Sequence, residues 1–239
     1  MNASKTQCMF VGTSQYLNMI DKNVTLKCGD DEIEISSHVK NLGLYMDKHM
    51  TYSVHIDEVS RKVTGILMYL NRIKDHFEDS TRIIIVQSLV LSVINYCIRI
   101  WGTTNDLNLN KAQKIVNFAA RVAVVGIRKY DHITPTLHHL QWLKIKDKYI
   151  YEVCLFVFKI LKSECPSWLY SFPNVGSCRD ASTRQNSNLQ VRRYRTDLGS
   201  RSMVIKGPSY WNDLPQNVKD CTGVSAFKKK LIDHFLRRM

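Results

Sequence analysis

Alternating and helical patterns of apolar residues divide the chain into a short β-rich beginning and a long helical remainder. Residues 24–35 predict a β-hairpin, because apolar and polar residues alternate on both sides of a Cys-Gly-Asp-Asp turn. Residues 5–12 also alternate and predict a short strand, whose partner we expect either from later in the sequence or from a missing segment.

Residues 38–72 form the junction between the two parts, and they predict a strand that runs directly into a long helix. Alternate positions of residues 42–47 are apolar, as in a half-buried strand. Thr51 and Ser53 offer hydroxyl groups as N-caps for a helix over residues 53–74. The apolar face of that helix consists of Val54, Val59, Val63, Ile66, Leu67, Leu70 and Ile73.

Helical spacing continues through most of the remaining chain. The predicted helices span residues 82–101, 106–125, 145–163 and 225–238, with a short one that starts at a Thr-Pro pair at 134–135. The sequence therefore predicts an α+β fold that is mainly α, with a small antiparallel sheet or hairpin at the N-terminus.

The segment 83–101 is about long enough to span a bilayer, but polar side chains interrupt it. Gln87, Asn95 and Arg99 lie within it, and a charge at mid-membrane costs roughly 2.5 kcal/mol or more. We expect a helix that is buried in protein, and no membrane partner.

Residues 171–206 differ from the rest because they are polar and rich in basic side chains. Two short runs, 189–191 and 203–205, predict a small strand pair, and residues 207–215 (GPSYWNDLP) predict a compact turn that Trp211 anchors to the core. Basic side chains with interleaved aromatics favour contact with a nucleic-acid backbone plus base stacking, and a flexible basic loop is the alternative.

The charge balance points to the same class of partner. The formal net charge is +13 and the isoelectric point is about 9.4, which favours a polyanion, although an inert basic surface has the same composition. The helix over 106–125 carries a basic face with Lys114 and Arg121, which suits either a phosphate backbone or solvent.

Cysteine usage and the N-terminus indicate a reducing compartment. The seven cysteines are an odd number without a CxxC pair, which fits free thiols better than a disulfide framework or a zinc site. The first twelve residues lack the apolar core of a signal peptide. We expect an intracellular protein, nuclear or cytoplasmic, that is not secreted.

Neither a catalytic motif nor a metal site is evident from residue spacing. The sequence contains no nucleophile elbow, phosphate loop, HExxH or Rossmann glycine pattern. Asp30 and Asp31 could suggest a two-metal site, but they fit a turn better. His132, His138 and His139 lack further ligands at a fitting spacing, so no metal site is predicted.

The order of several motifs resembles the C-terminal part of the reverse transcriptases of non-LTR retrotransposons, the jockey-like and related LINE-type elements. Residues 2–6 resemble the NxxKT block at the end of the palm, and residues 38–47 resemble its K-Y-L-G-V-x-L-D block, with Asn41 where an aromatic is usual. The likeness covers essentially the entire chain. Further matches are H-I with a later K at 55–62, YC-x-x-x-WG at 96–102, Q-K through A-A-R at 113–121, L-x-W-L at 140–143, WN-x-LP at 211–215 and F-K at 227–228.

This resemblance implies residues 1–50 as a remnant of the palm with a primer-grip-like hairpin. It implies residues 51–130 as a thumb-like helical bundle, and 131–239 as a helical C-terminal extension with a basic loop at 171–206. The family's catalytic aspartates lie N-terminal to the NxxKT block, so no catalytic residue is expected here. Lys5 is only the remnant of the palm lysine, and Mg²⁺ would belong to an intact polymerase.

The expected function is that of a reverse-transcriptase fragment that binds RNA or an RNA–DNA template-primer and is inactive alone. The missing palm and fingers segment is a possible further partner. A host-retained module that binds a protein or RNA, and a decayed copy without function, are the alternatives. The expected nucleic-acid-binding residues are Lys40, Lys62, Lys114, Arg121, Arg192, Arg193, Arg195 and Arg201. We also expect the N-terminal hairpin to pack against the following helices.

Overall fold

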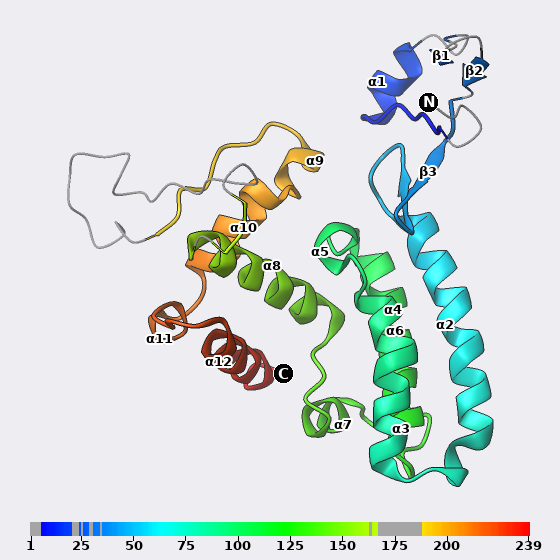
Figure 1. Cartoon of the computed structure of the whole chain (residues 1–239), viewed down its shortest axis with the longest axis vertical. Coiled ribbons are helices and arrows are strands. Elements are labelled where there is room, and N and C mark those ends of the chain that lie inside the picture. Colours follow the sequence, from blue (N-terminus) through cyan, green and yellow to red (C-terminus); the bar gives the residue numbers. More distant parts are fainter. Residues whose placement is uncertain are drawn as a thin grey trace. The chain divides into compact units, whose positions relative to one another are not determined.

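The computed structural model describes residues 6–20, 24, 26–28, 31–33, 35–162, 164–166 and 188–239. As predicted, the fold is mainly helical with small antiparallel sheets near the N-terminus (Figure 1). The chain divides into two compact units, Met1–Ile115 and Val116–Met239. The helix that crosses their boundary is α6, Asp106–Ala123.

The first predicted hairpin is confirmed, whereas the strand predicted over residues 5–12 is wrong. Strands β1 (Leu26–Cys28) and β2 (Asp31–Ile33) pair antiparallel. Residues 6–12 contribute a single parallel bridge, between Cys8 and Ile35. Helix α1 (Ser14–Met19) follows, and it was not predicted, because six residues are too few to show helical periodicity.

The second hairpin lies where one continuous strand was expected. Strand β3 (His38–Asn41) pairs antiparallel with β4 (Leu44–Asp47). Between them Leu42 and Gly43 have φ angles of 47° and 88°, and positive φ at both central residues is what a type I′ turn requires. Leu42 is therefore 87% exposed at the turn rather than in the core, which corrects the predicted alternation.

Helix α2 (Ser53–Ile73) confirms the predicted long helix but not its predicted N-cap. The N-cap is Tyr52, with φ 58° and no side-chain cap. The Asp47 carboxylate at the end of β4 instead accepts hydrogen bonds from the backbone N–H groups of His49, Thr51 and Tyr52, and from the Thr51 hydroxyl. One carboxylate thus joins the hairpin to the helix, because it accepts hydrogen bonds from the connecting residues and from the N–H group of the N-cap residue Tyr52.

The single helix predicted over 82–101 is divided into several pieces. The structure has a 3₁₀ turn η2 (Lys74–His76), α3 (Asp79–Val86), a π-helical segment η3 (Gln87–Leu91), α4 (Ser92–Asn95) and α5 (Ile98–Trp101). Cys97 adopts φ 53°, which ends α4 and starts α5 in a new direction. The sequence did not predict this break, because the apolar run at residues 83–101 contains neither Gly nor Pro.

Buried side chains from α2, the pieces between residues 79 and 101, and α6 form the core of the first unit. The hairpin β3–β4 packs against helices, with β4 lying on α2, whereas the packing expected of the hairpin at residues 24–35 stays a prediction. No helix in the described ranges is long and apolar enough to cross a membrane. The largest contributors to this core are Leu44, Ile56, Val63, Leu67, Val90, Ile94, Ile98, Trp101 and Ile115.

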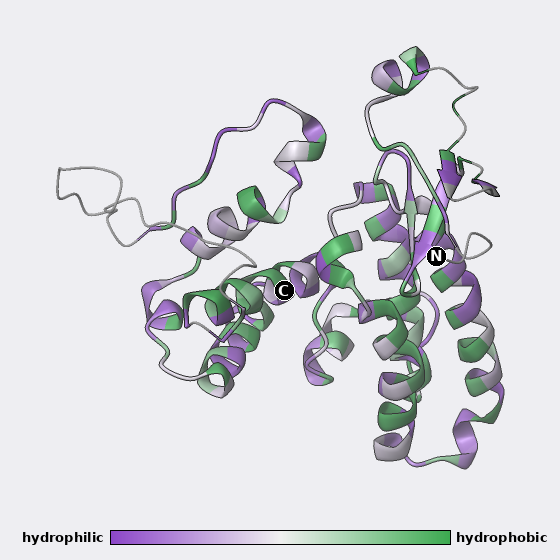
Figure 2. Ribbon diagram, turned by 45° about the horizontal axis from the view of Figure 1, so that its top comes forward, coloured by the Kyte–Doolittle hydropathy of each residue, from purple (hydrophilic) through white to green (hydrophobic). Residues whose placement is uncertain are grey.

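The second unit is built around α8 (Ile145–Leu161), which confirms the predicted helix. Helix α7 (Thr134–His139) begins at the predicted Thr-Pro pair, and α12 (Val224–Leu236) confirms the C-terminal helix. The remaining helices are α9 (Asp197–Ser200), α10 (Met203–Asn212) and α11 (Gln216–Lys219). Hydrophobic and hydrophilic residues alternate along these helices (Figure 2), as amphipathic packing requires.

Helix α10 corrects two predictions, the strand at 203–205 and the turn at 207–215. Gly207 and Pro208 suggested a turn, but both are buried and Pro208 lies inside the helix. Packing against α8 outweighs the local cost of a helical proline. The prediction that Trp211 packs in the core is confirmed, because Trp211 is 6% exposed and its ring centroid lies 5.9 Å from that of Phe227.

Candidate nucleic-acid interface

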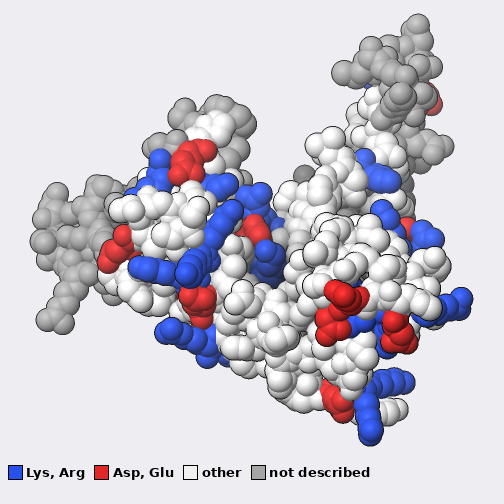
Figure 3. All heavy atoms as spheres, turned by 60° about the horizontal axis from the view of Figure 1, so that its bottom comes forward, with Lys and Arg blue, Asp and Glu red and all other residues white. Residues whose placement is uncertain are grey.

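On the face that Figure 3 shows, basic side chains are spread widely and do not gather in one patch. Figure 3 shows Lys and Arg side chains over the visible surface, with acidic side chains among them. Net charge alone therefore does not locate a binding site, and the geometry of individual side chains has to do so.

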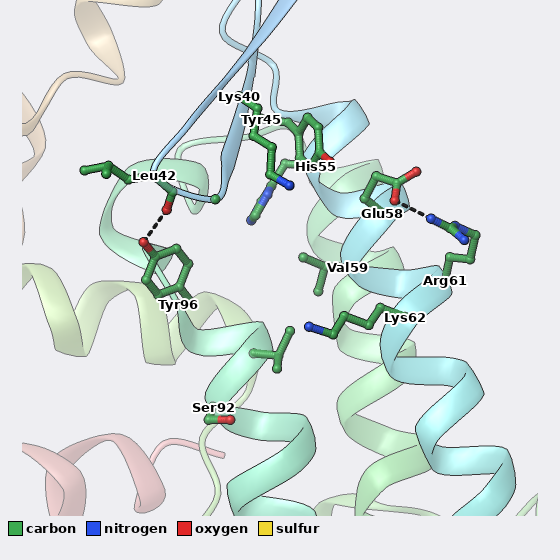
Figure 4. A pocket seen from close by; sticks show the side chains of 12 residues that line it. Lys40, Leu42, Tyr45, His55, Glu58, Val59, Arg61, Lys62, Ser92 and Tyr96 are labelled. Atoms are coloured by element: carbon green, nitrogen blue, oxygen red, sulfur yellow. Dashed lines mark hydrogen bonds and ion pairs between the residues drawn. The ribbon is translucent and has the colours of Figure 1, made fainter. Parts of the chain in front are cut away.

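A cleft in the first unit lies between the β3–β4 hairpin, the first turns of α2, and α4 (Figure 4). Its volume is about 640 Å³, within the roughly 300–1,000 Å³ range of ligand sites. It is lined by Lys40, Leu42, Gly43, Tyr45, His55, Glu58, Val59, Arg61, Lys62, Ser92, Val93 and Tyr96.

Tyr96 fixes the hairpin over this cleft. Its hydroxyl donates a hydrogen bond to the backbone carbonyl of Leu42 at 2.6 Å (Figure 4). The Trp101 indole N–H donates to the carbonyl of Tyr96 at 2.9 Å, across the left-handed residue Cys97. Because a Cβ at Gly43 would stand 3.7 Å from the Tyr96 ring, the turn is in van der Waals contact with the ring that holds it.

The cleft has a positive electrostatic character. Glu58 is the carboxylate among the lining residues, and it pairs with Arg61 at 2.6 Å (Figure 4). Lys40 and Lys62 form no ion pair with any described residue, and the Lys40 ammonium lies 5.0 Å from the centroid of the Tyr45 ring. Two uncompensated ammonium groups thus flank aromatic side chains in one concave site.

His55 is the buried polar group of the cleft. It is 3% exposed, and burial lowers the pKa of its imidazole below the ordinary value. Its ring centroid lies 6.3 Å from that of Trp101. Neither ring nitrogen has a hydrogen-bond partner within the described part of the chain.

The predicted basic residues of α6 differ in what they do. Lys114 is exposed to solvent. Arg121 is half-buried and donates to the carbonyls of Asn117, Arg128 and Asp131. Its guanidinium therefore closes the loop after α6, and these three bonds hold it in place there.

Three of the predicted arginines of the second unit lie in residues 190–195, before α9, and Arg201 lies at the C-terminal end of that helix. Arg192, Arg193 and Arg195 are exposed, as is Tyr194, at 58%. Arg201 is partly buried and pairs with Asp197 at 3.1 Å.

One side chain ties this basic segment to the second unit. The Asn212 side-chain oxygen accepts the backbone N–H of Leu189, and its amide donates to the Leu189 carbonyl, both at 2.9 Å. Leu189 is 1% exposed, so an amide pair that imitates a strand ladder holds the segment next to the core.

Several predictions fall on residues outside the described ranges. Lys5, Asp30 and the basic residues between 167 and 187 lie there, and of Asp31 only the backbone in β2 is described. Among the described residues no three His, Cys, Asp or Glu side chains gather as a metal site would require. The described cysteines with free thiols are Cys8, Cys97, Cys154, Cys165 and Cys221.

Of the predicted binding residues, the structure brings Lys40 and Lys62 together in the cleft. Sequence reasoning did not assign Tyr45, His55 or Tyr96 to a site. A signal for His55 exists, since it is a lone histidine one turn before Val59 and two before Val63, on the buried side of α2. Tyr96 gave no signal, because its role depends on a turn 54 residues earlier in the chain.

No family model, curated protein or solved structure matches this chain. The sequence motifs and the geometry of the cleft are therefore the basis for a functional proposal.

Proposed function

We propose that the chain is the thumb and C-terminal part of a non-LTR retrotransposon reverse transcriptase, and that it binds RNA or an RNA–DNA template-primer. The observation that carries the proposal is the cleft, in which Lys40 and Lys62 have no acidic partner among the described residues and stand beside Tyr45 and Tyr96. The exposed arginines at 192, 193 and 195 supply a second basic surface of the same chemistry.

The cleft offers the two kinds of contact that strands of nucleic acid use. Ammonium groups bind phosphates and release counterions, which gives affinity without sequence preference. Aromatic side chains accept the faces of unpaired bases at roughly 1–3 kcal/mol each. Basic and aromatic groups within one cleft therefore favour a nucleic acid over a small anion.

The residues that carry the family resemblance also support the proposal, because they build the cleft. The Leu-Gly pair at 42–43 makes the turn, and Asp47 joins the hairpin to α2. Tyr96 and Trp101, from the YC-x-x-x-WG block, hold that turn in place. A hairpin fixed over the first helix of a bundle suits a primer-grip-like element.

The test is the salt dependence of binding to a fluorescent RNA–DNA duplex, measured by anisotropy. We expect the wild-type affinity to fall steeply with salt. In the double variant Lys40→Gln/Lys62→Gln the slope of log K against log[salt] should be shallower by about 1.8, at about 0.9 per phosphate contact. The matched control Lys228→Gln/Lys229→Gln removes the same charge from the exposed side of α12 and should keep the wild-type slope.

Absence of binding, or binding that salt does not weaken, contradicts the proposal. A protein partner that remains bound after nuclease treatment and at high salt would instead support the interaction-module alternative. The residues that resemble the family begin after its catalytic aspartates, so we expect binding without primer extension. Magnesium-dependent nucleotide incorporation by the purified chain would overturn that part of the proposal.

A further inference from the structure

The imidazole of His55 is a polar group without a described partner at the inner wall of the cleft. His55 is only 3% exposed, and neither ring nitrogen has a hydrogen-bond partner among the described residues. An unpaired buried donor or acceptor costs roughly 1–3 kcal/mol. Such a group in a cleft points to a ligand that supplies the missing hydrogen bond.

A small void beside His55 has room for a partner of one of the two ring nitrogens. This void of about 10 Å³ is lined by His55, Ser60 and mainly apolar side chains, including Ile94 and Trp101. The Ser60 hydroxyl is also buried without a described partner, and the void has room for about one water that could bridge the two groups. The other ring nitrogen is left for the cleft.

The chemistry around the cleft narrows the ligand class. A neutral imidazole has one donor and one acceptor nitrogen, and the edge of a nucleobase presents complementary groups. Tyr45 and Tyr96 offer aromatic faces, and Figure 4 shows Lys40 and His55 directed into the same space, with Lys62 entering it from α2. Lys40 is exposed on a long flexible stem, so it can move aside and uncover the ring.

The geometry points to a pocket for one unpaired nucleotide, whose base edge bonds His55 and whose phosphate lies between Lys40 and Lys62. The inference rests on the proposed function and deepens it, because it names the part of the strand that the cleft takes. A volume of about 640 Å³ suits one nucleotide unit. The paired part of the duplex then remains outside the pocket.

Two RNA–DNA duplexes of equal length test this pocket, one blunt and one with a two-nucleotide single-stranded overhang. Wild-type chain should bind the overhang duplex about fivefold more tightly, as expected for one hydrogen bond to a base. His55→Phe keeps the ring but removes both nitrogens, and it should abolish this preference. The control His76→Phe, at an exposed histidine of η2, should retain it.

Each outcome bears on the two proposals separately. Equal affinity for the two duplexes with a steep salt dependence overturns the pocket and leaves the proposed function intact. A preference that persists in His55→Phe also overturns the pocket. Failure of both duplexes to bind removes the proposed function and the pocket together.

A measurement on the wild-type chain tests the pocket without depending on whether the His55→Phe variant folds. Adenosine 5′-monophosphate added to chain with ¹⁵N-labelled histidine should shift the His55 ring resonances, whereas inorganic phosphate should not. Shifts of equal size with both probes would reduce the site to an anion site, and no shift with the nucleotide would overturn the inference.

Discussion

At the scale of single residues, a few side chains form structural hydrogen bonds that the neighbouring sequence does not predict. Asp47 ends a strand and caps the next helix, and Tyr96 fixes a turn far away in the sequence. Arg82 is 5% exposed and donates to the carbonyls of Lys74 and Phe77, so it closes the connection between α2 and α3. Sequence periodicity predicts where helices lie, but such pairings depend on which loops meet in space.

Asp47→Asn tests the capping role of the carboxylate. Burial alone raises the pKa of Asp47, but hydrogen bonds from Thr51, His49 and Tyr52 outweigh it, and the net pKa is lowered from 3.8. The charged form is thus favoured in the folded state. Near neutral pH we expect the variant to lose about 1 kcal/mol of unfolding free energy.

The stabilisation by this carboxylate is complete above the unfolded pKa of 3.8, and it is lost as pH falls through the lower folded pKa. The difference in unfolding free energy between wild type and Asp47→Asn should therefore shrink below about pH 3.8, as measured by urea denaturation. The control Asp75→Asn, at an exposed position of η2, should cost less than about 0.5 kcal/mol. A difference that stays constant down to pH 2 would contradict the capping role.

At the scale of elements, strong periodicity predicted the long helices α2, α6, α8 and α12 and the hairpin at 26–33. Prediction failed where tertiary contacts override local signals. Residues 207–212 resemble a turn in sequence, but they are helical because Pro208 and Trp211 are buried. Residues 42–43 resemble a strand in sequence, but the positive φ of Leu42 makes them a turn. In both cases packing decides between local conformations of similar cost.

Asn212→Ala tests how the basic segment is held against the second unit. It removes both hydrogen bonds to Leu189 and leaves two buried backbone groups unpaired, at roughly 1–3 kcal/mol each. We expect the amides of residues 188–195 to exchange hydrogen at least about tenfold faster, measured by mass spectrometry. Gln216→Ala removes an exposed side-chain hydrogen bond to Asp220 and should leave this exchange unchanged. Equal protection in Asn212→Ala and wild type would show that other contacts hold the segment.

At the scale of the whole molecule, composition predicted a basic protein and the spacing of apolar residues predicted a mainly helical one, and the fold class is confirmed. The candidate site was predictable only in part. Lys40 and Lys62 were named from the sequence, whereas the aromatic and histidine side chains between them were not. These residues come from separate elements, β3, β4, α2 and the end of α4, and only the folded chain brings them into one cleft.

The central claim is that nucleic acid lies in this cleft, and ultraviolet cross-linking of the chain to an RNA–DNA duplex tests it most directly. Mass spectrometry should locate cross-links at Tyr45 and Tyr96, and Lys40→Gln/Lys62→Gln should weaken them. We expect cross-links at Tyr45 in the hairpin and at Tyr96 at the end of α4. Cross-links confined to residues 190–195, with none at Tyr45 or Tyr96, would contradict it.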